Sequence, residues 1–410
     1  MIDLVQLRKN PERFKEAVLK KDPSYDIDGL IQADEQYREL LLTIEVLRKK
    51  KNDLAKAFSG TVTEQMRQES SQIGKLLKEQ EEKLHTVELN FQNLYMSCPN
   101  PMHEDVPEGN KPENKQVRLI GSKPEFNFAP KDHVTLGNQL GWFDFATASK
   151  ITGSNFALYK APAVQLMYAL TRLMIKNNIK HGFEISLPPY MVNKKSLEAS
   201  GQLPKFADGV YKIQDEDLYL IPTAEVSLLN YFRDSIFELD QLPKRLTSWT
   251  SCFRREAGTY GASERGLIRI HEFEKVELVS FTQPENSYDE LERMVACAED
   301  ILKQLGLHYR VMLLASQDAS FQSAKTYDLE VWMPGQASFY EVSSASNCTD
   351  FQARRAKIRY RQQAGGKTEY VHTLNASSLE LPRLMVALME TYQQADGTII
   401  LPKVLLDQGW

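Results

Sequence analysis

The sequence predicts an α+β protein: an antiparallel sheet with flanking helices, preceded by an antiparallel hairpin of two long helices. Three observations predict this fold class. Residues 34–97 keep an apolar 3-4 spacing, residues 98–114 are polar and proline-rich, and the rest alternates short β-branched and aromatic runs with helical stretches. A chain of 410 residues with 42% hydrophobic content is long enough for two domains. We expect an N-terminal domain at 1–97, a linker at 98–114 and a second domain at 115–410.

The composition argues against several classes of protein. The formal net charge of −5 argues against a surface that coats nucleic acid throughout, but it is compatible with a local basic patch. The four cysteines, at 98, 252, 297 and 348, are too scattered for a disulfide framework or a CxxC-type zinc site. The N-terminus has no apolar signal segment, and no stretch has the roughly eighteen apolar residues of a membrane span. We therefore expect a cytoplasmic protein without zinc.

Each half of residues 34–97 carries its own apolar seam, as helices of a coiled coil do. The first seam consists of Tyr37, Leu40, Ile44, Leu47, Lys51, Leu54 and Phe58. The second consists of Met66, Ser70, Ile73, Leu77, Gln80, Leu84, Val87, Phe91 and Leu94. Between them, residues 58–63 supply a glycine turn and Thr63 as a helix N-cap. Two helices that fold back within one chain need no second chain, so we rank this hairpin above a dimerisation rod or a spacer.

A basic cluster lies near the expected turn of the hairpin and consists of Arg48, Lys49, Lys50 and Lys51. A run of charge on a helix is most often a solvated face. Taken alone, the residues favour that interpretation.

The expected strands of the second domain are short, and few are separated by a helix. They are residues 218–221, 267–281, 309–314, 327–332 and 339–342. The expected helices are residues 163–175, 287–305 and 383–393, with Pro382 in the first turn of the last. Because most strands lack an intervening helix long enough for a parallel crossover, an antiparallel sheet is favoured.

An unusual density of charge marks the segment Phe253–Glu277, FRREAGTYGASERGLIRIHEFEKVE, which has the pattern of a β-hairpin. Side chains alternate between the faces of a strand, so Arg269, His271, Phe273, Lys275 and Glu277 share one face. Antiparallel pairing would bring two side chains of the incoming strand, those of Arg254 and Glu256, to the same surface. Arginines are suited to phosphate, an aromatic ring to a base, and carboxylates to an ammonium or hydroxyl group. This combination suggests an aminoacyl-adenylate site; the alternative is a surface hairpin with cross-strand ion pairs.

Several motifs, in order and over nearly the whole chain, resemble the seryl-tRNA synthetase family of class II aminoacyl-tRNA synthetases. Residues 253–277 resemble motif 2 of that family, and residues 220–225, LIPTAE, resemble its serine-binding segment. Further matches are KTYDLEVW at 325–332, EVSS at 341–344, DFQARR at 350–355 and YVHTLN at 370–375. The N-terminal hairpin corresponds to the tRNA-binding arm of this family.

The resemblance implies a class II catalytic domain at 115–410 and an activity in two steps. L-serine and ATP would give seryl-adenylate and pyrophosphate, and the seryl group would then pass to the 3′ end of tRNA(Ser). It also implies Mg²⁺, a serine pocket without zinc, and a homodimer formed through motif 1, which would be residues 182–191 with the preceding helix and Pro189 at its proline position.

Site residues follow from the resemblance by matching position. Arg254 would hold the α-phosphate, Phe273 would stack on adenine, and Arg269 and Arg383 would flank the outer phosphates. The residues of the serine pocket would be Thr223, Ala224, Glu225, Glu277, Asn375 and Ser377. The ATP site would comprise Arg254, Arg255, Glu256, Phe273, Glu341, Val342, Ser343, Ser344 and Arg383. Glu341 and Ser344 would bind Mg²⁺, and the cluster at 48–51 would bind tRNA. The catalytic set would be Arg254, Glu256, Arg269 and Arg383. His271 is interpreted as structural, because this chemistry needs no general base.

The chain departs from the pattern of the family near its C-terminus. Residues 375–383 read NASSLELPR, where the family commonly has NGSGLAVGR, so three glycines are replaced and Glu380 is added. The usual arginine near residues 154–156 is also missing. Two alternatives therefore stay open: a catalytically inactive binding or regulatory paralogue, and a synthetase-like enzyme that charges a carrier protein. Enzymes of the second kind resemble the family only in the catalytic domain. If the protein is active, Glu380 should turn outward or pair with a cation.

Overall fold

The computed structural model describes residues 1–57, 63–256 and 266–409, and the chain divides into two compact units, Met1–Pro99 and Asn100–Trp410. The expected turn of the helical hairpin (58–62) and the middle of the charged loop (257–265) lie outside the described residues. The division places residue 100 onward with the second unit; the domain boundaries expected above stay a prediction.

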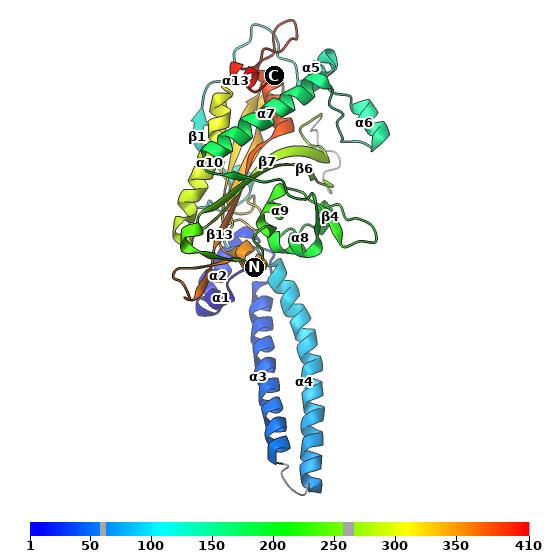
Figure 1. Cartoon of the computed structure of the whole chain (residues 1–410), viewed down its shortest axis with the longest axis vertical. Helices are drawn as coiled ribbons and strands as arrows, with labels where there is room; N and C mark the ends of the chain where they lie inside the picture. Colours follow the sequence, from blue (N-terminus) through cyan, green and yellow to red (C-terminus); the bar gives the residue numbers. More distant parts are fainter. Residues whose placement is uncertain (58–62, 257–265, 410) are drawn as a thin grey trace. The chain divides into compact units, whose positions relative to one another are not determined.

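The first unit is helical and contains the expected hairpin (Figure 1). Its helices are α1 (Leu4–Lys9), α2 (Pro11–Lys21), α3 (Ile27–Ala57) and α4 (Glu64–Ser97). Thr63 caps α4, since its side chain accepts a hydrogen bond from the Met66 N–H, as predicted. Within the described residues the seam is also confirmed: Ile44, Ile73 and Phe91 are buried, and the Tyr37 and Phe91 rings stack at 5.2 Å, whereas Phe58 lies outside these residues.

Helix α3 begins earlier than the apolar spacing at 34–97 suggested. Ile27, Leu30 and Ala33 are buried in the first turns, and α3 also contacts α2 there. Asp34 then receives two hydrogen bonds from the Arg8 guanidinium, at 2.6 and 2.8 Å. The helix therefore starts in a small packed base and continues into the two-helix arm.

The second unit is built on an eight-stranded sheet in the order β1-β8-β9-β10-β13-β7-β6-β2. All neighbours are antiparallel except β2 and β6, which confirms the antiparallel prediction. The strands are β1 (Lys115–Ile120), β2 (Glu184–Ile185), β6 (Lys244–Phe253), β7 (Glu272–Thr282), β8 (Tyr309–Leu313), β9 (Lys325–Met333), β10 (Ser338–Asn347) and β13 (His372–Glu380).

Helices cover both faces of this sheet. On one face, α7 (Ala161–Lys180), α10 (Ser287–Gln304) and α12 (Leu381–Thr391) form the main hydrophobic core with Val276 and Leu278 of β7. On the other, α9 (Ala224–Asn230) packs on Val279 and Phe281. Successive residues of β7 thus point alternately to the two helical layers.

The other elements of the second unit are short. They are α5 (His133–Leu140), α6 (Phe145–Ile151), α8 (Lys194–Ser200), α11 (Phe351–Ala356), α13 (Lys403–Leu406), β3 (Met191–Asn193), β4 (Leu218–Leu220), β5 (Ile236–Glu238), β11 (Arg359–Arg361), β12 (Thr368–Tyr370), and 3₁₀ turns at Lys111–Glu113, Ala207–Gly209, Leu239–Gln241 and Pro284–Asn286. In the described part of the chain, no helix is both long and apolar enough to cross a membrane.

The predicted strand at 267–281 is wrong over its first residues, because β7 begins only at Glu272. Leu267, Ile268 and Ile270 are buried, which explains the strand-like apolar pattern. Their backbone, however, bonds to side chains: the Leu267 N–H donates to His133 Nε2, and the Ile268 carbonyl accepts from Arg383. Partners of this kind are not visible in a local sequence pattern.

Candidate active site

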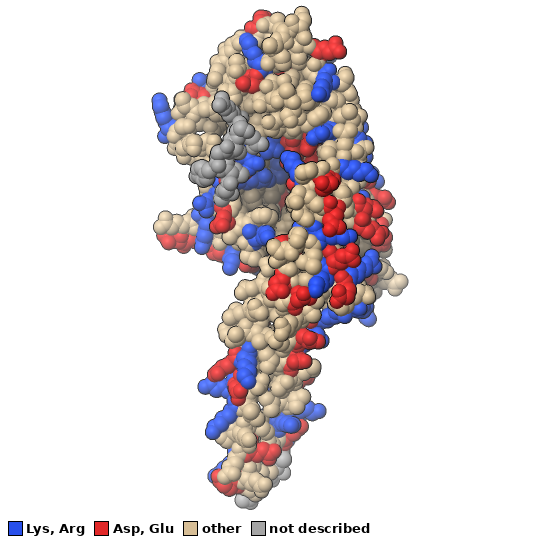
Figure 2. Space-filling model, turned by 180° about the vertical axis from the view of Figure 1, so that it is seen from behind, with Lys and Arg blue, Asp and Glu red and all other residues tan. Residues whose placement is uncertain are grey.

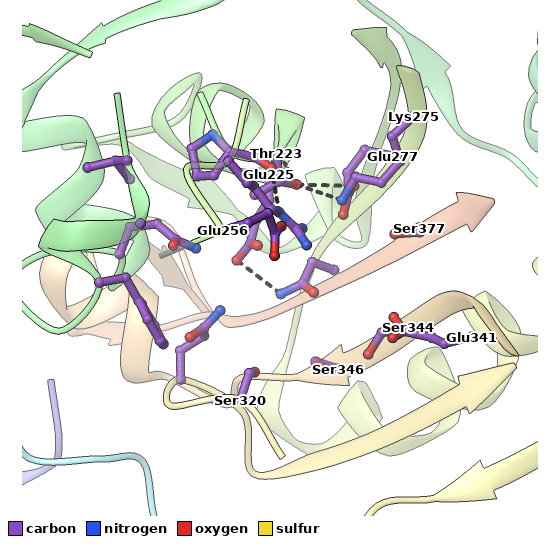
Figure 3. Close-up of a pocket in the computed structure, with 18 residues that line it drawn as sticks. Thr223, Glu225, Glu256, Lys275, Glu277, Ser320, Glu341, Ser344, Ser346 and Ser377 are labelled. Atoms are coloured by element: carbon purple, nitrogen blue, oxygen red, sulfur yellow. Dashed lines mark hydrogen bonds and ion pairs between the residues drawn. The ribbon is translucent and has the colours of Figure 1, made fainter. Parts of the chain in front are cut away.

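The second unit contains a cavity of about 440 Å³ that is lined by residues within β7, β10 and β13 and by residues that follow β4 and β6. Figure 2 shows the hollowed face, and Figure 3 shows side chains from distant segments converging on the space. Nine of the sequence-predicted residues line it: Thr223, Glu225, Arg254, Glu256, Glu277, Glu341, Ser344, Asn375 and Ser377. The volume is suited to a small molecule or nucleotide fragment with several polar groups.

One wall of the cavity is built around Glu225 at the start of α9. Thr223 caps this helix, and its hydroxyl accepts a hydrogen bond from the Glu225 N–H at 3.3 Å. Oε1 of Glu225 accepts hydrogen bonds from the side-chain amides of Gln352 and Asn375, at 2.5 and 3.1 Å. Burial, followed by the nearby charge of Glu277, raises the pKa of Glu225 to about 7.

A second carboxylate, Glu277 of β7, lies in the same wall. Its Oε2 is 2.5 Å from the ammonium of Lys275 and 3.2 Å from the Thr223 hydroxyl. Burial raises the pKa of Glu277, and the Lys275 charge opposes that shift. The cavity therefore presents two buried carboxylates, which is suitable for a ligand with an ammonium and a hydroxyl group.

Arg254 follows the end of β6 and lies against Phe273 of β7. Its guanidinium carbon is 5.1 Å from the centre of the Phe273 ring, and Nε donates to the Pro222 carbonyl at 3.3 Å. The ring is only 7% exposed and does not line the cavity. An adenine base could reach the ring face that Arg254 covers only if the guanidinium moved, so the stacking role of Phe273 stays a prediction.

The charged loop leaves the sheet at Glu256, where φ is +47°. The Arg269 guanidinium bonds the Glu256 carboxylate at 2.6 Å, so these two expected site residues are brought together. Arg255 is exposed and does not line the cavity; its backbone N–H donates to the Gly209 carbonyl. His271 contacts the Arg254 carbonyl through Nδ1 at 3.0 Å, an arrangement that fits its interpretation as structural.

Arg383 lies in the first turn of α12, and its contacts with neighbouring residues fix its direction. It donates to the carbonyls of Ile268 and Glu341, its Nε is 3.0 Å from the Glu380 carboxylate, and its Nη1 is 3.5 Å from the Glu341 carboxylate. Glu380 is therefore paired with a cation, as expected for an active enzyme. Pro382 occupies the first turn of α12, again as predicted.

The other departures from the family pattern are accommodated locally. Ala376 is buried within β13, and the Ser378 hydroxyl donates to Asn178 at a bulge in the pairing of β13 with β7. Near the missing arginine, Asn155 has a φ of +59° and its carbonyl accepts the His271 N–H.

The expected magnesium ligands, Glu341 and Ser344 of β10, line the cavity together. Asp328 of β9 lies opposite Ser344, and its Oδ1 is buried without a hydrogen-bond partner. A set of oxygen donors fits a hard cation such as Mg²⁺. Among the residues that the structure describes, no three acidic, histidine or cysteine side chains are grouped as a metal site. A divalent ion here would depend on one or two protein groups and on phosphate oxygens.

Seven expected site residues are not among those that line the cavity: Ala224, Arg255, Arg269, Phe273, Val342, Ser343 and Arg383. Ala224 and Val342 are buried in hydrophobic clusters, and Ser343 donates its hydroxyl hydrogen bond to the Ser377 carbonyl at 2.5 Å. Conversely, sequence reasoning missed nine residues that line the cavity, namely Gln202, Phe206, Gly209, Val210, Pro222, Lys275, Ser320, Gln322 and Ser346, and it missed Gln352, which contacts Glu225. Lys275 was placed on the right face of its strand but given no role, and Gln352 lies in a helix whose motif gave no hint of its contact with Glu225.

In the first unit, the basic cluster 48–51 lies on α3. All four side chains are exposed, and Arg48 is paired with Glu81 of α4 at 2.8 Å. Successive residues of a helix are separated by about 100°, so the four side chains point in different directions.

Comparisons with known proteins agree with these observations. A family model described as the seryl-tRNA synthetase N-terminal domain matches residues 1–102, and one described as the tRNA synthetase class II core domain (G, H, P, S and T) matches residues 210–392. The serine–tRNA ligase of Fervidobacterium nodosum is 45% identical over 414 residues, covering 99% of this chain and 97% of its own. The chain belongs to the seryl-tRNA synthetase family. The class II antiparallel architecture expected from the sequence is thereby confirmed.

Two solved structures of seryl-tRNA synthetases are similar to this structure over nearly the whole chain. The enzyme from Pyrococcus horikoshii, complexed with ATP, is 35% identical with a TM-score of 0.94, covering 100% of this chain and 98% of the other. The cytoplasmic serine–tRNA ligase of Naegleria fowleri, in complex with AMP, is 27% identical with a TM-score of 0.85, covering 97% and 94%. The similarity to the family includes the N-terminal domain. Enzymes that charge a carrier protein are expected to resemble the family only in the catalytic domain.

Proposed function

We propose that this protein activates L-serine with ATP and then transfers the seryl group to the 3′ end of tRNA(Ser). The observation that carries the proposal is the pair of buried carboxylates in one cavity, each with one oxygen held by the protein. Glu225 is held by Gln352 and Asn375, and Glu277 by Lys275 and Thr223. The second oxygens are suited to the ammonium and the hydroxyl of serine.

The reaction requires no protein nucleophile. In the first step, a serine carboxylate oxygen forms a bond to the α-phosphorus of ATP while the bond to the bridging oxygen breaks, and pyrophosphate leaves. We assign Arg254 to the α-phosphate and Arg269 and Arg383 to the outer phosphates, so that their guanidinium groups neutralise developing charge and hold the groups in line. In the second step, a ribose hydroxyl of tRNA attacks the adenylate carbonyl and AMP leaves.

Magnesium is proposed as the metal of this site, with Glu341 and Ser344 as its protein ligands. When bound, it would neutralise charge on the phosphate oxygens. The contribution of the chain itself is to hold the Glu341 backbone in place, which it does through the Arg383 hydrogen bond to the Glu341 carbonyl.

The inactive-paralogue alternative rests on Glu380, whose carboxylate would repel a triphosphate if it were unpaired. Its ion pair with Arg383 favours an active enzyme. Serine-dependent ATP–pyrophosphate exchange by the purified protein tests the proposal. We expect exchange with serine and little with alanine, which lacks the hydroxyl. A protein that shows no exchange with serine would contradict the proposed function.

We also propose a homodimer formed through motif 1. The segment 182–191 contains β2 at the edge of the sheet, and its Ile185, Leu187 and Met191 side chains are exposed, as are Tyr168 and Ile179 of α7. A cluster of exposed apolar side chains is typical of a surface that a partner covers. Sedimentation equilibrium is expected to give a dimer, and a monomer at micromolar concentration would contradict it. The cytoplasm is the compartment that charging of tRNA implies.

A further inference from the structure

Lys275 lies beside Glu277 in the serine wall of the cavity (Figure 3). It lies on β7, two residues before Glu277, and both side chains point to the cavity face of the strand. Its Nζ is 2.9 Å from the Thr223 hydroxyl and 2.5 Å from Glu277 Oε2. The Lys275 side chain is 7% exposed and that of Glu277 is 2% exposed, so the pair is shielded from bulk water.

The hydrogen bonds around Thr223 have a defined polarity. An ammonium group can only donate, so the Thr223 oxygen accepts from Lys275, and it also accepts from the Glu225 N–H. These two bonds use both lone pairs of the hydroxyl. Its single proton is then directed to Glu277 Oε2, at 3.2 Å. Thr223 is left with neither a donor nor an acceptor for a substrate.

The hydrogen bonds of the Glu277 carboxylate fix one of its two oxygens. Its Oε2 accepts from Lys275 and Thr223, whereas the hydrogen bonds within the described chain leave Oε1 without a donor. A carboxylate with one oxygen fixed by a cation presents the other in a set direction. That second oxygen is the acceptor available to the hydroxyl of a small substrate.

Other charged and titratable groups also face this pair. They are Glu225 of α9, Arg254 and Cys252 at the end of β6, and Glu380 of β13. Burial raises the pKa of Glu277, whereas Lys275 and then Arg254 favour its ionised form. Lys275 is the only one of these cations with a hydrogen bond to Glu277 among the described residues.

We propose that Lys275 is a positioning residue for serine selection that acts through Glu277. Its ammonium holds Glu277 as an ionised acceptor with Oε1 directed to the substrate hydroxyl, and it sets the Thr223 hydroxyl as a donor to the same carboxylate. Thr223 then contributes by orienting Glu277. This inference rests on the proposed function of the same site.

A double-mutant cycle tests whether Lys275 acts through Glu277. In the full-length protein, Lys275→Met is expected to lower kcat/KM for serine in pyrophosphate exchange at least tenfold at pH 7, with KM for ATP changed less than twofold. Glu277→Gln alone should also lower it. The double variant should be no worse than Glu277→Gln, because Lys275 has no further target once the carboxylate is gone. Additive losses would overturn the inference.

The pH profile gives a readout that a merely structural lysine would not move. Without Lys275, the pKa of Glu277 should rise, so the carboxylate needed for serine is protonated at neutral pH. The ratio of Lys275→Met to wild-type kcat/KM should therefore increase between pH 7 and pH 9. Because the Lys275 charge also lowers the pKa of Glu225, the comparison is repeated in a Glu225→Gln background, where only Glu277 of these two carboxylates can titrate. A ratio that is flat across this range would contradict the proposal.

Controls distinguish this inference from the proposed function. Lys325 of β9 is also largely buried and pairs with Asp105 at 3.7 Å, but it does not line the cavity. Lys325→Met should leave kcat/KM for serine within twofold. If Lys275→Met does not fold, the neutral double variant is expected to fold and can be compared with Glu277→Gln. If the wild-type protein is active and the Lys275→Met variant is unaffected, this inference alone is overturned. If the wild-type protein is inactive, both this inference and the proposed function are overturned.

Discussion

The helical arm and the cavity use the same charged residue types under opposite conditions. On the arm, side chains of both signs are intermixed on the surface (Figure 2), and pairs such as Arg48–Glu81 and Lys83–Glu79 are about half exposed. In the cavity, the Lys275–Glu277 pair is buried, and Glu225 lies beside it. Water and salt screen the first kind of charge, whereas the second kind acts over short distances in a low dielectric.

This difference predicts how each region responds to substitution. In the cavity, a single change leaves another buried group without its partner, and the cost is large. On the arm, one exposed ion pair contributes little, so the effect must come from many charges together and must depend on salt. The predictions below run from the largest expected effect to the smallest.

Glu277→Ala should have the largest effect of a single substitution. It removes the proposed acceptor of the serine hydroxyl and leaves Lys275 buried without its counter-charge. We expect a loss of about 2–4 kcal/mol in kcat/KM for serine and a smaller gap between serine and alanine. Glu272→Ala, at an exposed position of the same strand, is the matched control. If serine is still preferred over alanine to the wild-type extent, Glu277 is not the acceptor.

Arg383→Ala should reduce serine-dependent exchange at least tenfold, about 1.4 kcal/mol. The substitution removes the hydrogen bonds to Ile268 and Glu341 and the proposed contact with phosphate. Glu380→Gln keeps the shape of the residue that pairs with Arg383 but removes its charge. It should change serine-dependent exchange less than threefold. A variant at Glu380 that is more active than wild type would instead favour the inactive-paralogue alternative.

The pH dependence of serine use should reflect Glu225. Because its pKa is raised to about 7 by burial and by Glu277, it takes up a proton as the pH falls through this value. A protonated carboxyl no longer attracts the serine ammonium, so kcat/KM for serine should fall about tenfold per unit below pH 7. The dependence should disappear in Glu225→Gln at a low overall rate. An unchanged pH profile in that variant would assign the titration to another group.

Neutralising the basic cluster 48–51 should have the smallest effect at physiological salt. The four side chains point in different directions on α3, so about two can meet one phosphate backbone. Changing all four to glutamine should reduce the slope of log K for tRNA binding against log salt concentration. We expect a reduction of about two, rather than the four expected if every charge met a phosphate. Changing Arg67, Lys75, Lys78 and Lys83 of α4 removes the same charge and is the control. Equal effects of both sets would mean that only the overall field matters.

The arm was the more predictable region, because its signal is local. The seam from Tyr37 to Leu94 repeats every few residues, and Thr63 marks a helix start without reference to any other segment. The cavity is assembled by the strand order of the sheet, which places β13 between β7 and β10. Alternation along β7 located Lys275 on the correct face. Its bond to Thr223 could not be predicted, because the two residues meet only through tertiary packing.

The same limit applies to the segment before β7. Apolar residues at 267–270 have the pattern of a strand, and only the contacts with His133 and Arg383 show why the backbone takes another course. Gln352 likewise reaches Glu225 from α11, a helix that contributes no other residue to this wall of the cavity. The residues of the site could be predicted from the resemblance to the family, whereas their hydrogen-bond partners could be identified only from the structure.

Removal of the arm tests the separation of the two regions most directly. Residues 41–89 would be replaced by a short turn, and serine-dependent pyrophosphate exchange and charging of tRNA(Ser) would be measured on the same preparation. Because the carboxylates, arginines and proposed metal ligands all belong to the second unit, exchange should stay within threefold of wild type. Charging should fall by at least a hundredfold. Full charging without the arm, or loss of exchange in a folded protein, would contradict the account.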